Sequence, residues 1–110
     1  MSISALASGL SGMEAFQRAL DVTANNVANV DTNGFRPQQA SFANLIGGGV
    51  NATASSPVAP QSISASLAPS GTDLVAETVN SLQYKYGFDL SAQVVKTANE
   101  TLGTLINIAA

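Results

Sequence analysis

The sequence predicts an all-α chain in which two long helices, one at each end, pair as an antiparallel, coiled-coil-like hairpin. Two observations predict the helices: apolar residues recur at three- and four-residue spacing over 1–30, and again over 73–108. A third observation separates them. The stretch 37–72 is rich in Gly, Ser and Pro and contains no charged residue. We therefore divide the chain into an N-terminal helix with an Asn-rich motif (1–36), an irregular low-complexity connector (37–72) and a C-terminal helix (73–110).

The composition excludes several classes of function. The 110 residues include no Cys and no His, which excludes disulfides, thiolate or imidazole catalysis and the usual zinc or haem sites. Only four Lys and Arg residues stand against seven Asp and Glu, with a formal net charge of −3, which argues against binding to nucleic acid. We expect no cofactor, no metal, no nucleic acid and no small-molecule substrate.

The size and the small side chains predict a thin core. A chain of this length forms one domain at most. Hydrophobic residues make up 45% of it, but many are Ala and only 5% of the chain is aromatic. Such residues bury little apolar area in a monomer. Only 10% of the residues are charged. A surface with few charges and many small side chains is suited to contacts with copies of the same chain or with its relatives. The alternative is a small Ala-rich helical protein that needs no partner.

The segment 1–30 is predicted to form one helix. Ser2 or Ser4 can cap its start, and Gly9 and Gly12 weaken its first turns by about 1 kcal/mol each relative to Ala. Gln17 is the one polar interruption in the apolar stripe. The stripe consists of Ile3, Leu6, Leu10, Met13, Leu20, Ala24 and Val27. The segment has neither a basic region nor a continuous apolar run, so we expect no cleaved signal peptide. No run approaches the roughly 18 apolar residues of a membrane span, so we expect no such span.

Three asparagines mark the end of this helix. Asn25, Asn26 and Asn29 have amides that can cap carbonyls, bond one another or bond a neighbouring chain. The turn 31–34 follows, in which Asn33 or Gly34 can adopt a left-handed conformation. The ordinary interpretation of this stretch is a well-capped helix end.

The connector contains few large side chains. Phe35 and Phe42 can fold back on the helices or dock on a neighbour. The triple glycine 47–49 is no phosphate loop, because no Lys-Ser/Thr follows it. Alternation over 61–67 also allows a short strand there.

The segment 73–108 is predicted to be helical, with Thr72 or Asp73 as its cap. Gly87 marks a bend or a close helix contact. Tyr84 and Tyr86 lie on or beside an apolar face, and the acidic residues form no cluster, so we expect no enzyme activity. Two apolar lines indicate burial on several sides. The first is Val75, Val79, Leu82, Tyr86, Leu90, Val94, Leu105 and Ile108; the second is Val95, Ala98, Leu102 and Ile106.

Two motifs resemble the flagellar rod and hook protein family. Residues 24–36, Ala-Asn-Asn-Val-Ala-Asn-Val-Asp-Thr-Asn-Gly-Phe-Arg, meet every fixed position of the family's N-terminal signature. Residues 96–103, Lys-Thr-Ala-Asn-Glu-Thr-Leu-Gly, are similar to its C-terminal motif, from which Asn99 and Thr101 depart. Phe88 stands where the family commonly has Tyr. These departures bear on which subtype of the family the chain resembles, and not on the resemblance to the family.

The resemblance implies a minimal, rod-type structural subunit of the basal body. Its partners would be copies of itself, other rod and hook proteins and the flagellar type III export apparatus, which exports the family across the cell envelope without a cleaved signal. The rival interpretation is a free-standing helical bundle that acts as an adaptor or export chaperone. We expect the assembly contacts to come from Ile3, Leu6, Leu10, Met13, Leu20, Asn25, Asn26, Val27, Asn29, Val94, Ala98, Leu102 and Leu105.

Overall fold

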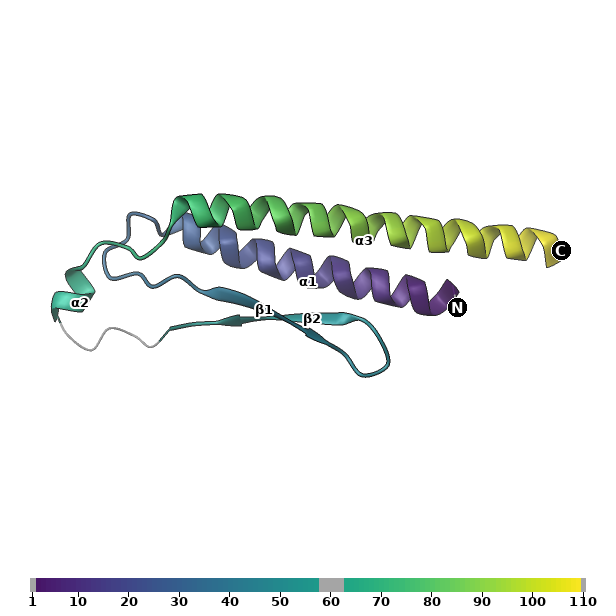
Figure 1. Ribbon diagram of the computed structural model, residues 1–110, viewed down its shortest axis with the longest axis horizontal. Coiled ribbons are helices and arrows are strands. Elements are labelled where there is room, and N and C mark those ends of the chain that lie inside the picture. Colours follow the sequence, from purple (N-terminus) through teal and green to yellow (C-terminus); the bar gives the residue numbers. More distant parts are fainter. Residues whose placement is uncertain (1, 58–62, 110) are drawn as a thin grey trace.

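The computed structural model describes residues 2–57 and 63–109 of the chain. Two long helices run antiparallel, and a β-hairpin lies along α1 (Figure 1). The elements in chain order are α1 (Ser2–Ala28), β1 (Gln39–Asn44), β2 (Val50–Ser55), α2 (Ile63–Leu67) and α3 (Leu74–Ala109). The molecule is elongated, with principal extents of 69 × 25 × 15 Å.

The helices begin and end where local chemistry favours it. The Asp73 carboxylate accepts hydrogen bonds from the backbone N–H groups of Val75 (3.0 Å) and Ala76 (3.2 Å), so Asp73 is the cap of α3. At the end of α1, the Asn25 carbonyl accepts two hydrogen bonds from Asn29, one from its Nδ2 (2.8 Å) and one from its backbone N–H (3.2 Å). Gly34 then takes the left-handed conformation, with φ of 76°.

Glycines set the distance between α1 and α3. A Cβ added at Gly12 would lie 2.6 Å from Ser91 Oγ, and one at Gly87 would lie 2.5 Å from the ring of Phe16. Gly87 is therefore a close helix contact. The glycines near the start of α1 were expected to weaken the helix, but the structure gives Gly12 a packing role that local propensity does not show.

The prediction of an all-α chain was wrong. Residues 39–44 and 50–55, expected to be irregular, form a two-stranded antiparallel sheet in which Phe42 pairs with Ala52. The turn between the strands uses Gly47, Gly48 and Gly49, all with positive φ. The short strand considered over 61–67 was also a wrong prediction, because Ile63–Leu67 form the helix α2. Residues 61 and 62 lie outside the residues that the structure describes.

Packing on the helices explains why this hairpin forms without a strong strand pattern. The Phe42 ring lies 5.3 Å from the Phe16 ring of α1 and 5.7 Å from the Tyr84 ring of α3. Arg18 donates from Nη1 to the Ala52 carbonyl (3.4 Å), and Ser11 Oγ accepts from the Val50 N–H (3.1 Å). The stability of the hairpin thus depends on tertiary contacts. Strand propensity, which considers only a few neighbouring residues, does not take these contacts into account.

Candidate assembly surfaces

The face of α1 that packs within the chain is rich in small residues. Ala15 and Ala19 are fully buried, and Thr23 and Asn26 continue the same face. The predicted apolar stripe lies beside this face and is left largely uncovered. Ile3 is 72% exposed and Leu10 is 51% exposed, whereas Leu6, Met13 and Leu20 are half-buried. The structure thus separates the surface that holds the chain together from the larger apolar side chains.

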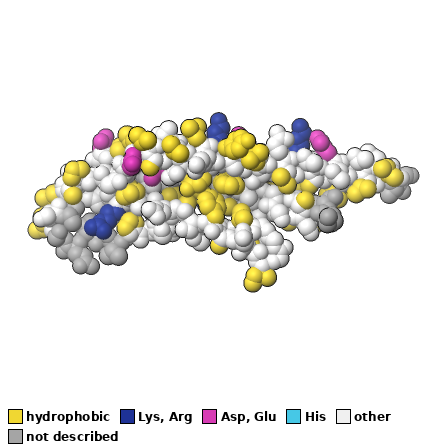
Figure 2. Space-filling view, viewed as in Figure 1, with side chains coloured by type: hydrophobic (Ala, Val, Ile, Leu, Met, Phe, Trp, Pro, Cys, Tyr) yellow, Lys and Arg dark blue, Asp and Glu magenta, His cyan; other side chains and the backbone are white. Residues whose placement is uncertain are grey.

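α3 shows the same separation. Its inner face includes Glu77, Val95, Ala98 and Leu102, so the second apolar line is the one that faces α1. The first line is exposed, and Val94 marks its border with α1, near Gly9. We call the first five members of this line, which follow helical spacing, the α3 stripe; they are Val75, Val79, Leu82, Tyr86 and Leu90. Figure 2 shows apolar side chains along the whole visible face, with few charges between them.

The structure distributes the predicted assembly residues over three environments. Asn26 and Ala98 are buried, so they serve contacts within the chain. A half-buried group borders these contacts: Leu6, Met13, Leu20, Asn29 and Leu102. The exposed group remains free for contacts with another molecule: Ile3, Leu10, Asn25, Val27, Val94 and Leu105. We keep the assembly role of these residues as a prediction.

Asn26 is the centre of a buried polar cluster that joins three segments of the chain. Only 1% of the residue is exposed. Its Nδ2 donates to the Gln38 carbonyl and to Glu77 Oε1, both at 2.8 Å, and its Oδ1 accepts from the Gln38 N–H at 2.8 Å. Thr72 Oγ1 donates to the Asn26 carbonyl (3.0 Å). We call Asn26, Gln38, Thr72 and Glu77 the asparagine node.

The asparagine node ties α1 to the strand entry and to α3. Glu77 is 8% exposed, so the bond from Asn26 compensates part of the cost of burying its carboxyl group. The sequence singled out Asn26 but not its partners Gln38 and Glu77. Glu77 lies in the first turn of α3, where an acidic residue is common for reasons local to the helix, and no local signal marks Gln38. Only the antiparallel pairing of distant segments brings these side chains together.

The other two asparagines have local roles. Asn29 bonds back to Asn25, and its Oδ1 accepts a hydrogen bond from Thr32 Oγ1 at 3.1 Å. Asn25 makes a long contact from Nδ2 to Gln38 Oε1 at 3.4 Å. The three amides therefore divide between capping the helix end and cross-linking the chain.

Tyr84 sits where the aromatic contacts meet the asparagine node. Burial, and to a smaller extent the negative charge of Glu77, raise the pKa of Tyr84 above its ordinary value of 10.0. The folded chain thus keeps this proton at a pH at which the unfolded chain has begun to lose it. Stability from this group is complete below pH 10 and is lost as pH rises through the folded-state pKa.

We therefore expect the native chain to lose stability above pH 10 more steeply than the Tyr84→Phe variant, which lacks the ionisable hydroxyl. The measurement is the urea midpoint of both proteins between pH 8 and 11, followed by circular dichroism. If the urea midpoints of the two proteins fell equally with rising pH, the prediction would be contradicted.

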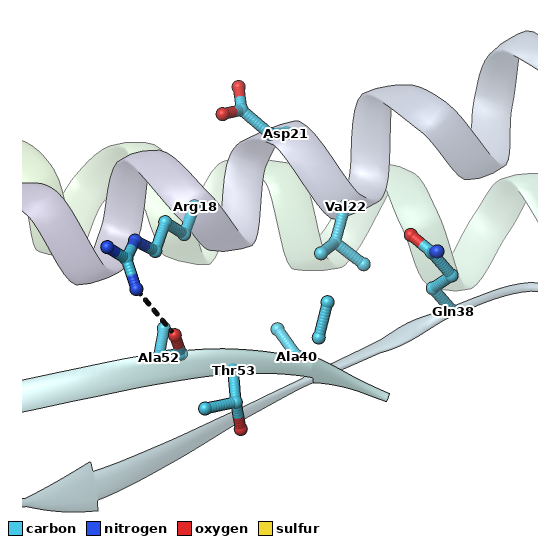
Figure 3. A pocket seen from close by; sticks show the side chains of 8 residues that line it. Arg18, Asp21, Val22, Gln38, Ala40, Ala52 and Thr53 are labelled. Atoms are coloured by element: carbon cyan, nitrogen blue, oxygen red, sulfur yellow. Dashed lines mark hydrogen bonds between the residues drawn. The ribbon is translucent and has the colours of Figure 1, made fainter. Parts of the chain in front are cut away.

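A cleft of about 400 Å³ lies between α1 and the hairpin (Figure 3). Arg18 points to the Ala52 carbonyl, Val22 points toward the sheet, and Asp21 points away from the sheet. Asp21 Oδ1 accepts from Gln17 Nε2 at 3.1 Å. The charged groups of this cleft thus bond to neighbouring parts of the chain, and the arrangement holds the hairpin on α1.

Neither a metal centre nor a membrane span is found in the part of the chain that the structure describes. No three Asp or Glu side chains there gather closely enough to hold a metal ion. None of its helices combines the length and apolarity needed to cross a bilayer.

Comparisons with known proteins match both ends of the chain. Residues 6–36 match a family described as flagella basal body rod protein, and residues 63–108 match one described as flagellar basal body rod FlgEFG protein C-terminal. Together these two matches take in most of both long helices and leave out the whole hairpin.

Individual relatives show the same likeness over shorter stretches. The flagellar hook protein FlgE of Helicobacter mustelae is 59% identical over 39 residues, which are 36% of this chain and 9% of that protein. The flagellar basal-body rod protein FlgG of Bacillus subtilis is 49% identical over 41 residues, 37% of this chain and 16% of that protein. The flagellar hook protein FlgE of Treponema pallidum is 47% identical over 49 residues, which are 44% of this chain and 11% of that protein. Each match spans only a small part of the relative's length.

Proposed function

Because this chain belongs to the family of flagellar basal-body rod and hook proteins, we propose that it is a structural subunit of the flagellar rod that assembles with its own kind through its terminal helices. The observation that carries the proposal is the exposure of large apolar side chains on both helices, which lie outside the close contact that Gly12 and Gly87 allow between α1 and α3. Exposed apolar surface of this extent marks interaction sites.

The surface area supports this proposal. A compact monomer of 11.1 kDa is expected to expose about 5,700 Å². This chain exposes 7387 Å². The excess of about 1,700 Å² agrees with the elongated shape of the chain, whose extents are 69 × 25 × 15 Å. A standard interface buries about 800 Å² on each partner, so the exposed surface is large enough for contacts with other subunits.

The family places the protein at the flagellar basal body or hook. We further propose that it lies in the periplasm-spanning rod, that it contacts other rod and hook proteins, and that the flagellar type III apparatus exports it without a cleaved signal. A structural role of this kind involves no catalysis, in agreement with the absence of Cys and His from the sequence.

The proposed function predicts that a strain lacking this chain is non-motile and that a tagged copy, which restores motility, is found in purified basal bodies. The Val79→Asp variant places a charge in the α3 stripe and should restore less than a tenth of the motility. Gln83→Asp, at an exposed polar position of the same helix, is the matched control and should restore it fully.

Light scattering of the purified chain distinguishes the two interpretations. Growth of large species with concentration supports a rod subunit. A dimer of constant size at all concentrations, together with a motile deletion strain, would favour the adaptor or chaperone.

A further inference from the structure

The turn after α1 contains the single Asn-Gly pair of the chain, Asn33-Gly34. In an Asn-Gly pair the backbone nitrogen reaches the preceding side chain most readily, because glycine has no Cβ to hinder the approach. Asn33 is exposed, and no side-chain hydrogen bond joins it to the described part of the chain. Asn26 and Asn29, by contrast, are held by hydrogen bonds of 2.8 Å. The Asn33 amide is therefore the one of these three that lies open to reaction.

Two backbone hydrogen bonds hold the other reacting group in place. The Gly34 N–H donates to the Ala68 carbonyl at 2.6 Å, and the Gly71 N–H donates to the Phe35 carbonyl at 3.0 Å. We call these two bonds the turn bridge. They join the turn to the segment between α2 and α3, which passes beside it in Figure 1. A Cβ added at Gly34 would overlap the Ser66 carbonyl, so this part of the chain lies directly against the Gly34 backbone.

We propose that Asn33 is a site of spontaneous deamidation and that the turn bridge controls its rate. In this reaction the Gly34 nitrogen loses its proton and attacks Cγ of Asn33. The new N–C bond closes a succinimide ring, the bond from Cγ to Nδ2 breaks, and Nδ2 leaves with the proton as ammonia. Water then opens the ring at either carbonyl, which yields aspartate or isoaspartate at position 33.

The turn bridge slows the first step for two reasons. The Gly34 N–H keeps its proton while it donates to the Ala68 carbonyl, and the backbone of residues 66–68 prevents the nitrogen from turning toward the Asn33 side chain. The reaction therefore requires that the segment 66–71 leaves the turn. Local openings of this kind occur in native proteins with free energies below that of global unfolding. The rate of deamidation thus depends on how often the turn opens.

The product prevents the turn from closing as before. An isoaspartate has an additional methylene in the backbone, which displaces the Gly34 N–H from the Ala68 carbonyl. Either product also adds a negative charge near Asp31, just beyond the C-terminal end of α1, where the helix dipole disfavours anions. Deamidation therefore marks irreversibly a chain whose turn has opened, and it weakens the end of α1.

Mass spectrometry of the full chain after incubation at pH 8 tests the proposed site. Chymotrypsin cleaves after Leu20 and Phe35, so the peptide 21–35 contains Asn33 together with Asn25, Asn26 and Asn29 as internal references. In urea, we expect Asn33 to deamidate about tenfold faster than the three references, because glycine follows only Asn33. Equal rates at all four asparagines in urea would overturn the proposal. Asn33→Gln is the control that removes the site.

The same measurement without urea tests the protection by the fold. We expect the rate at Asn33 to fall by about tenfold or more in the native chain, which corresponds to an opening free energy of about 1.4 kcal/mol or more. Hydrogen exchange of the Gly34 amide, followed by nuclear magnetic resonance, should be slowed by a similar factor, since both reactions need the same opening. If native and unfolded chains deamidate at the same rate, or if the native Gly34 amide exchanges without protection, the proposed control by the turn bridge falls.

A matched pair of variants isolates the turn bridge. Gly71→Pro and Gly71→Ala both add a Cβ at residue 71, but only proline lacks the N–H that donates to Phe35. We expect Asn33 in folded Gly71→Pro to deamidate about fivefold faster than in Gly71→Ala, the effect of losing one ordinary hydrogen bond. Asn26, which is buried in the asparagine node, should react equally slowly in both variants. Equal rates at Asn33 in the two variants would overturn the role of the turn bridge.

Discussion

Replacing Asn26 with alanine is expected to lower the free energy of unfolding by about 3 kcal/mol. The change removes three side-chain hydrogen bonds of 2.8 Å in a site that is 1% exposed. It leaves the Gln38 N–H and the Glu77 carboxyl group without these partners. An unsatisfied buried polar group costs about 1–3 kcal/mol, and a charged one costs more. Since small proteins are stable by about 5–15 kcal/mol, a chain with so thin a core would lose a large share of its stability.

Urea unfolding followed by circular dichroism measures this effect, and Asn25→Ala is the matched control. Asn25 is exposed, and its side chain makes only contacts of 3.4 Å. Its replacement should cost less than about 1 kcal/mol. Glu77→Gln keeps an oxygen that accepts the bond from Asn26, so it separates the effect of the charge from that of the hydrogen bond. Equal losses for Asn25→Ala and Asn26→Ala would refute the central role of the asparagine node.

Replacing Gly87 with leucine is expected to destabilise the chain by about 3 kcal/mol, because the helices can no longer approach one another. Even the Cβ would lie 2.5 Å from Cε1 and Cζ of Phe16. That ring cannot move freely, since it packs on Phe42, which in turn packs on Tyr84. Overpacking of a filled site typically costs about 1–3 kcal/mol, and a whole leucine side chain belongs at the upper end of this range.

The same substitution at Gly103 is the control. A Cβ at Gly103 meets no atom within 4 Å, so only the helix propensity changes there. Leucine should stabilise the helix at this position by a little under 1 kcal/mol relative to glycine. Thermal unfolding of both variants should therefore shift in opposite directions. A shift to lower temperature for both would mean that helix packing does not cause the loss at Gly87.

The boundaries of the long helices could be predicted, because caps and periodicity are local. Asp73 caps α3 as one of two expected candidates, and α1 ends at Ala28, two residues before the expected end. The hairpin could not be predicted in this way. Its strands, Gln39–Asn44 and Val50–Ser55, are rich in Ala, Ser and Asn, and they are held by Phe42 and by bonds to Arg18 and Ser11 from α1.

The sequence by itself determined that this chain has two amphipathic helices at its ends, an Asn-rich helix terminus and a surface poor in charge, because these features depend on neighbours along the chain. Only the tertiary structure decided which face of each helix is buried. Gly12, Ala15 and Gly87 allow the two helices to pack closely, so the faces that carry them meet, and Ile3, Leu10 and the α3 stripe remain exposed. Helical periodicity locates an apolar face, but the closest approach of two backbones selects the one that packs.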